Sequence, residues 1–208
     1  GRTLWRMAEV VIERRRLRQS FEGSVSPPVL KEILAGRLTP QASGEKLDIC
    51  VLFSDIRGFT TLSEKMLPED ATDLLNRYFV SMSAVIHQND GTLDKFIGDG
   101  IMAIFGSPQR LDNPCQSAFN AAVAMFKALD EFNETQFARG GPQLRMGVGL
   151  HYGPVFVGYI GSSTRNSYSA IGDTVNVASR LEQLTKSLGC SLVFSNAVQQ
   201  RLLNDMGA

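Results

Sequence analysis

The chain has 208 residues, of which 43% are hydrophobic and 20% charged, so it is long enough to bury one sizeable core. The formal net charge is zero, which leaves no global field to draw the chain to nucleic acid. Three scattered cysteines and two histidines give little material for a zinc or redox site. We therefore expect one globular domain with no nucleic-acid partner, which must bind any polyanion locally.

The first 45 residues are predicted to be a helical linker. The pattern of residues 5–19 predicts a basic helix. Residues 29–35, which follow two prolines, are predicted to form a short helix. Two interpretations of the basic helix stay open, a solvated helical face or a juxtamembrane or signalling linker. No apolar stretch approaches the roughly 20 residues of a membrane span. Because the chain lacks an initiator Met, we expect a cytoplasmic piece of a longer protein, with a sensory domain or membrane anchor before residue 1.

The main globular domain is predicted over residues 46–208, as strands alternating with helices. Residues 47–53 are a near-continuous apolar run, typical of a strand buried on both faces. An Asp-Gly pair at 99–100 between two apolar runs indicates a hairpin. The other expected elements are helix 68–89, hairpin strands 92–97 and 101–105, helix 114–137, hairpin strands 144–151 and 155–160 turning at Tyr152-Gly153-Pro154, helix 173–188, strand 191–194 and helix 196–203.

This order of elements predicts the fold class. It runs β, α, β-hairpin, α, β-hairpin, α, β, which is typical of an α/β (α+β) sandwich. We expect a mixed β-sheet with the helices packed on one face.

Two aspartates stand at the tips of apolar runs, Asp55 in the segment FSDIRGFT and Asp99 in KFIGDG. A carboxylate at the end of a buried strand is held rigidly and still reaches solvent, as a divalent cation site requires. Either one alone is more simply a cap or turn residue. Together they indicate a two-carboxylate site that could clamp Mg²⁺ against phosphates.

A third segment, residues 168–182, places Asn176 and Arg180 at positions i and i+4 of a helix, on one face. An amide and a planar guanidinium on one face can hold a ribose and the oxygens of a reacting phosphate. In an isolated helix, a solvated Asn and an Arg paired with a nearby Glu would be the simpler interpretation.

Taken together, the segments FSDIRGFT, DKFIGDGIMAIFG and AIGDTVNVASRLE resemble the class III nucleotidyl cyclase catalytic domain, the adenylyl and guanylyl cyclase family. The resemblance runs from about residue 46 to about residue 195. It implies a ferredoxin-like sandwich that works as a head-to-tail homodimer with composite active sites. It also implies that the ribose 3′-hydroxyl attacks the α-phosphate of ATP, giving 3′,5′-cyclic AMP and pyrophosphate, with two Mg²⁺ ions per site that Mn²⁺ can replace.

The resemblance assigns roles by motif position. Asp55, Asp99 and the backbone carbonyl of Ile56 are the expected metal ligands. Asn176 is expected to position the ribose and Arg180 to stabilise charge on the α-phosphate, both reaching in from the partner chain.

Two further positions bear on the choice of base. Lys95 stands where adenylyl cyclases have Lys and guanylyl cyclases usually have Glu, and a cation there can donate to adenine N1. Ser169 stands where a bacterial subclass often has Thr, and it can accept from the adenine amino group. A solvated strand-edge lysine is the alternative for Lys95. Both positions favour ATP.

Two departures from the family pattern matter. Gly147 stands where many relatives have Arg, and Arg145, two residues back on the same strand face, is the candidate phosphate contact in its place. Relatives also continue into a C-terminal strand pair with a lysine that grips the triphosphate, so we expect a C-terminally truncated domain. The alternatives to an adenylyl cyclase are a guanylyl cyclase with unusual base contacts and a catalytically silent cyclase-like regulatory module.

Overall fold

The computed structural model describes residues 27–37, 44–161 and 166–205. The predicted basic helix over 5–19 lies outside these residues. The predicted short helix is present as α2 (Pro27–Leu34), and it begins two residues earlier than expected. Proline has a fixed φ that suits the first turn of a helix, so the two prolines start this helix instead of preceding it. The expected domain boundary at residue 46 stays a prediction.

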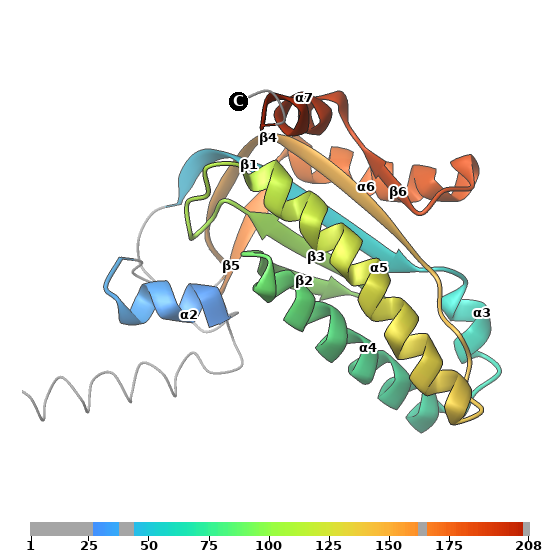
Figure 1. The fold of residues 1–208 in the computed structure, drawn as a ribbon. Helices are drawn as coiled ribbons and strands as arrows, with labels where there is room; N and C mark the ends of the chain where they lie inside the picture. Colours follow the sequence, from blue (N-terminus) through green and yellow to red (C-terminus); the bar gives the residue numbers. More distant parts are fainter. Residues whose placement is uncertain (1–26, 38–43, 162–165, 206–208) are drawn as a thin grey trace, which may run out of the picture.

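Six strands of the described residues form one mixed sheet: β1 (Glu45–Ile56), β2 (Thr92–Ile97), β3 (Gly100–Phe105), β4 (Met146–Gly161), β5 (Asn166–Ile171) and β6 (Leu192–Phe194). The strand order is β2-β3-β1-β4-β5, and β6 also pairs with β4 (Figure 1). All pairs are antiparallel except β4–β6, which is parallel. The fold class and the mixed sheet are therefore confirmed.

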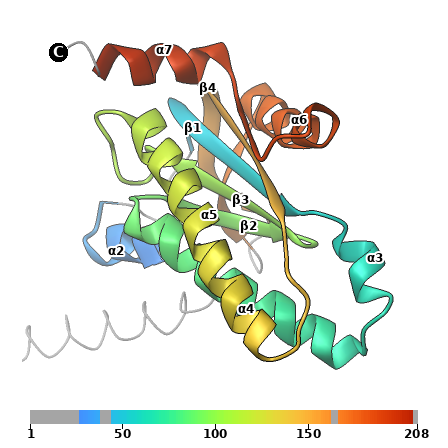
Figure 2. The same ribbon diagram turned by 45° about the vertical axis from the view of Figure 1, so that its right-hand side comes forward.

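The helices cover both faces of the sheet, so the prediction that they pack on one face is wrong. On one face lie α4 (Pro68–Gln88) and α5 (Pro114–Ala138), and α7 (Asn196–Asp205) adds to the same core (Figure 2). On the other face α6 (Asp173–Leu188) packs against β4. Gly149 makes this close approach possible, because a Cβ there would collide with the backbone of α6.

The second predicted hairpin is also wrong. Instead of turning at residues 152–154, β4 runs unbroken and pairs with β1 along its length, with Asp48 opposite Pro154. Among the described residues, β6 pairs with β4 only as far as Leu150 and β5 only from Phe156 onward, so one edge of β4 has no strand partner at Pro154. Proline has no N–H to donate, and such a gap in the ladder tolerates it. The true hairpin partner of β4 is β5, a strand that the sequence prediction missed.

The two ends of the strand order approach one another. The hydroxyl groups of Tyr168 on β5 and Ser107, just after β3, lie 2.7 Å apart, and Ser169 on β5 bonds to Asp94 on β2. The sheet is therefore strongly curled. A second core cluster fills its concave side, and α2 contributes Val29 and Ile33 to it.

The first predicted hairpin is confirmed: β2 and β3 join at Gly98 and Asp99, and Gly98 has a φ of 60°, in the left-handed region that glycine adopts easily. The predicted helices over 68–89, 114–137 and 173–188 are confirmed within one residue at each end. A short helix, α3 (Phe59–Ser63), follows β1 and was not predicted.

Candidate functional site

The two predicted metal ligands lie together at one end of the sheet. Asp55 is the penultimate residue of β1, and Asp99 lies in the β2–β3 turn, where its Oδ2 accepts a hydrogen bond from the backbone N–H of Ile56 at 3.2 Å. Burial, together with a hydrogen bond and the like charge of Asp55, raises the pKa of Asp99 to about 7. Two carboxylates this close share protons unless a cation neutralises them. Their arrangement therefore fits a divalent cation.

The surroundings of this carboxylate pair define what else a metal ion would need. Lys186 of α6 places its Nζ 3.5 Å from Oδ2 of Asp55. Within the described parts of the chain, there is no group of three or more His, Cys, Asp or Glu residues that could hold a metal ion. Since hard divalent cations take six or more oxygen ligands, the pair needs further oxygens, such as the Ile56 carbonyl, water and phosphates.

A cavity of about 480 Å³ lies on the same side of the sheet as Asp55. Its floor includes Phe53, which shares a face of β1 with Asp55 because side chains alternate along a strand. Lys95 of β2 and Asn176 of α6 are both among its lining residues. The structure thus brings together the residues predicted to contact the base and the ribose.

The other predicted base residue, Ser169, is not among the residues that line this cavity. Ser169 is only 2% exposed, and its hydroxyl donates to the carboxylate of Asp94. The next residue, Ala170, lines the cavity. Sequence reasoning gave Asp94 no role, although it begins the motif DKFIGDG.

The structure does not bring Arg180 to this cavity. Arg180 is exposed on α6, one turn beyond Asn176, which is also exposed. Neither residue is among the hydrogen-bonded groups that hold Asp55 and Asp99 in place. Within one chain, the predicted transition-state arginine therefore faces solvent.

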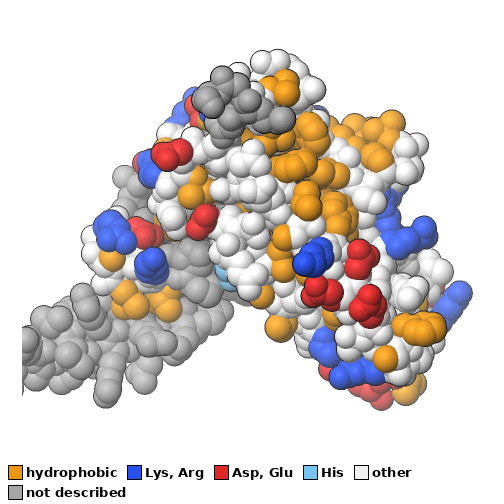
Figure 3. Space-filling view, in the orientation of Figure 1, with side chains coloured by type: hydrophobic (Ala, Val, Ile, Leu, Met, Phe, Trp, Pro, Cys, Tyr) orange, Lys and Arg blue, Asp and Glu red, His pale blue; other side chains and the backbone are white. Residues whose placement is uncertain are grey.

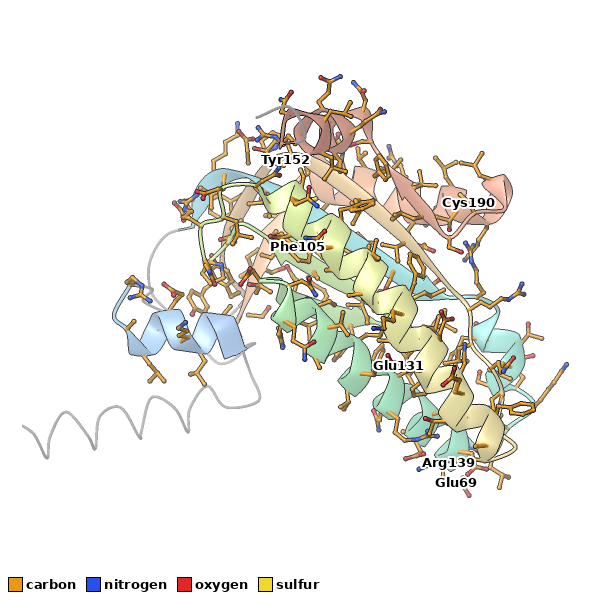
Figure 4. All side chains as sticks on the ribbon, viewed as in Figure 1. Glu69, Phe105, Glu131, Arg139, Tyr152 and Cys190 are labelled. Atoms are coloured by element: carbon orange, nitrogen blue, oxygen red, sulfur yellow. The ribbon has the colours of Figure 1, made fainter. Side chains whose placement is uncertain are left out.

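Arg145 lines a different cavity, of about 340 Å³, together with Arg57 and Lys186. Arg57 is held in place, because its Nη2 donates to Thr185 Oγ1 at 2.7 Å and to the carbonyl of Cys190 at 2.9 Å. Figure 4 labels Cys190 at the junction between α6 and β6. Sequence reasoning missed Arg57 and Lys186, although Arg57 belongs to the same FSDIRGFT segment as Asp55.

The carboxylate pair and the basic cavity, which Lys186 links, make this end of the sheet distinct from the α4–α5 face. On that face, acidic and basic side chains are interspersed (Figure 3). The end of the sheet near Asp55 instead combines a carboxylate pair with a basic cavity, a combination suited to a metal-bound polyphosphate.

The fold and the motifs can be compared with known proteins. Residues 42–206 match the sequence model of the family described as "Adenylate and Guanylate cyclase catalytic domain". An adenylate cyclase of Anabaena cylindrica is 38% identical over 186 residues, which is 88% of this chain and 35% of that protein. Adenylate cyclase 1 of Rhizobium meliloti is 38% identical over 170 residues, 82% of this chain and 25% of that protein. The chain thus spans about a third or less of these relatives.

Two solved structures resemble this chain to the same degree as one another. The adenylyl cyclase CyaB from P. aeruginosa has a TM-score of 0.72 and 34% identity, covering 78% of this chain and 84% of that chain. The guanylyl cyclase Cya2 has a TM-score of 0.72 and 35% identity, covering 77% of this chain and 80% of that chain. The overall similarity of these two structures to the chain therefore does not distinguish adenine from guanine as the base of its substrate.

None of the helices in the described ranges has the length and apolar character that crossing a membrane requires. The matched family model spans most of the chain, and the relatives are well above 30% identical. The fold, the paired aspartates and these matches together show that the chain belongs to the adenylate and guanylate cyclase catalytic domain family.

Proposed function

We propose that this domain is an adenylyl cyclase, which converts ATP to 3′,5′-cyclic AMP and pyrophosphate. The observation that carries the proposal is the cavity shared by Lys95 and Asn176 on the side of the sheet that also holds Asp55. A lysine donates hydrogen bonds and accepts none, which suits the N1 acceptor of adenine and opposes the N1–H donor of guanine. Ser169, which precedes the lining residue Ala170, is the proposed partner of the adenine amino group.

Asp55, Asp99 and the backbone carbonyl of Ile56 would hold the divalent cations, two Mg²⁺ or two Mn²⁺ per site. When bound, the ions would acidify the ribose 3′-hydroxyl and neutralise the triphosphate. The raised pKa of Asp99 supports this assignment, because a cation would remove the repulsion between the two ionised carboxylates.

The phosphates of ATP have a candidate binding surface in the basic cavity. Arg145, the predicted phosphate contact, shares it with Arg57 and Lys186, and Lys186 already lies beside Asp55. A triphosphate held by the carboxylate-bound cations could extend toward these three side chains. We therefore assign the phosphate-binding role to the cluster instead of to Arg145 alone.

A homodimer with composite sites is the proposed assembly. Arg180 is exposed and is not among the contacts of Asp55 and Asp99 in its own chain, as expected for a residue that serves the partner's site. Large apolar side chains around the base cavity also remain exposed, Ile97 by 53% and Ile171 by 50%. Apolar side chains gathered at a cavity rim are typical of an interaction surface. Since the relatives are longer than this chain, an upstream sensory or membrane domain in the parent protein is part of the proposal.

The experiment that tests the function is product formation from ATP and from GTP, at matched concentrations, with Mg²⁺ and then with Mn²⁺. We expect cyclic AMP from ATP and little product from GTP. Cyclic GMP as the main product would make the domain a guanylyl cyclase. Nucleotide binding without any product, also in a chain extended at the C-terminus, would make it a catalytically silent module.

A further inference from the structure

Asp94 lies at a β-bulge that turns its side chain away from solvent. Leu93 pairs with Ala103 and Lys95 pairs with the next residue, Met102, so Asp94 is the extra residue in the β2 ladder. A bulge redirects the side chain it carries, and bulges are frequent beside active sites. The side chain of Asp94 is 0% exposed, which is rare for an aspartate and requires specific partners.

Three donors surround this buried carboxylate. The Ser169 hydroxyl lies 2.8 Å from Oδ1 and 2.9 Å from Oδ2, and the backbone N–H of Ala170 donates to Oδ2 at 2.9 Å. The ammonium group of Lys95 lies 3.5 Å from Oδ1. Burial has the largest effect and raises the pKa of Asp94 above its ordinary value, although the bonds from Ala170, Ser169 and Lys95 act to lower it. These three donors stabilise the ionised form, which accepts hydrogen bonds and cannot donate them.

The carboxylate fixes what its neighbours can offer to a ligand. Ser169 has a single hydroxyl proton, and Asp94 receives it, so only the lone pairs of Ser169 remain for a further partner. Lys95 has three ammonium hydrogens and keeps some of them free after its contact with Asp94. The two side chains therefore present one acceptor and one donor, both held by the same buried group.

We propose that Asp94 is a positioning residue that sets base specificity, because it fixes Ser169 as a hydrogen-bond acceptor next to Lys95 as a donor. The proposal rests on the proposed function, since it needs a purine nucleotide in the cavity that Lys95 lines. Adenine carries a donor amino group beside the acceptor N1, which matches this pair. Guanine carries an acceptor oxygen beside a donor N1–H, so it would place an acceptor opposite the acceptor Ser169 and a donor opposite the donor Lys95. Asp94 does not itself contact the nucleotide.

A purely structural role for Asp94 gives a different expectation. The bonds from Ser169 and Ala170 also tie β5 to β2 and so hold the curled sheet together. If that were their only effect, loss of the carboxylate would lower stability and would lower kcat/KM for ATP and for GTP alike. The ratio of kcat/KM for ATP to that for GTP therefore distinguishes the two roles.

The test begins with Asp94→Asn, which keeps the size of the side chain. Its amide can donate to Ser169, which frees the hydroxyl proton to point toward the base. We expect the kcat/KM ratio of ATP to GTP to fall by about tenfold or more, through a higher KM for ATP, with kcat at saturating ATP changed only a few-fold. The matched control is Asp90→Asn, at an exposed residue with a φ of 61° that asparagine tolerates. It should leave the ratio unchanged.

A second variant covers the case in which Asp94→Asn does not fold. Ser169→Ala removes the acceptor itself and should lower the same ratio by a similar factor. In a Ser169→Ala background, Asp94→Asn should then change the ratio much less than it does alone, because it acts largely through Ser169.

Nucleotide binding keeps this inference separate from the proposed function. Competition of ATP and of GTP against a fluorescent ATP analogue, with Ca²⁺ present, measures the preference without turnover. A wild-type chain that binds ATP over GTP but forms no cyclic product would refute the proposed function alone. The role of Asp94 is overturned if folded Asp94→Asn or Ser169→Ala keeps the wild-type ratio of ATP to GTP. It is also overturned if a variant binds both nucleotides more weakly by the same factor, or if the wild-type chain does not prefer ATP to GTP.

Discussion

Replacing Asp99 by asparagine should stabilise the metal-free protein at neutral and alkaline pH, although it removes a proposed metal ligand. Burial and Asp55 raise the pKa of Asp99 from 3.8 to about 7. Because this folded-state pKa is higher than the unfolded-state value, ionising Asp99 opposes folding. The penalty is absent at pH values below the unfolded-state pKa, grows as the pH rises between the two values, and is complete above the folded-state pKa.

The size of the effect follows from the shift and the exposure. The full shift would correspond to about 4 kcal/mol at 1.36 kcal/mol per unit. Asp99 is only partly buried, so solvent screens the interaction, and we expect about 1 kcal/mol. Asparagine carries no charge at any of these pH values and escapes the penalty.

The assay is urea unfolding of both proteins in EDTA, at pH values below and above the folded-state pKa of Asp99. Asp130→Asn, at an exposed position on α5, is the control for loss of one negative charge. Adding Mn²⁺ above that pKa should stabilise the wild-type protein more than the variant, because a ligand that binds the folded state raises its stability. If Asp99→Asn is no more stable than wild type above the pKa, or stabilises the protein equally at acid pH, neither burial nor Asp55 penalises the ionised form of Asp99 and the reasoning fails.

Three further predictions test the composite site and the packing. Asp99→Ala and Arg180→Ala should each abolish turnover while leaving the fold intact. An equal mixture of the two should recover about a quarter of wild-type activity, because random pairing makes half of the dimers heterodimers, each with one complete site of two. A mixture as inactive as its components would exclude sites shared between chains. Gly149→Ala should lower the unfolding free energy by about 2 to 4 kcal/mol, since its Cβ meets the backbone of α6, and a wild-type melting temperature would contradict this packing. Asn113→Ala should lower it by about 1 kcal/mol, because the side chain accepts from the backbone N–H groups of Cys115 and Gln116 at the start of α5, and calorimetry would detect the loss.

Local patterns predicted most of the fold. The apolar residues of α4 recur at helical spacing, and a proline stands at its first turn, so its start and end were found from the sequence. The Asp99-Gly100 pair correctly indicated the first hairpin, because turn chemistry is local, although the turn lies one residue earlier, at Gly98 and Asp99.

The errors came from features that depend on distant contacts. Gly153 and Pro154 have the composition of a turn, yet β1 pairs across them, and only the gap between β5 and β6 makes a proline acceptable there. The packing of helices on both faces depends on glycines of β4 that face α6 and that look locally like turn or ligand-approach residues.

The candidate site also contains residues that local motifs predicted and residues whose roles depend on distant contacts. All predicted site residues except Arg145 lie in one of the quoted motifs or segments. The structure brings Asp55 close to Asp99, and it places Lys95 and Asn176 in the lining of one cavity. Lys186 lies outside these segments, and Asp94 lies inside one without a recognisable role, because the roles of both arise from neighbours about 130 and 75 positions away in the chain. The assignments of the site residues to metal, base and phosphate remain predictions that the proposed experiments test.

The short helix α2 ties the segment before it to the part of the domain that is proposed to bind the base. Val29 and Ile33 are buried in the concave core with Met102 and Ala170, which also line the cavity proposed for the base. Burying two aliphatic side chains contributes about 3 to 6 kcal/mol. A force applied through the preceding residues would therefore either extract α2 against that energy or shift the cavity wall with it. In the second case, a mechanical signal would reach the cavity wall without any separate regulatory ligand.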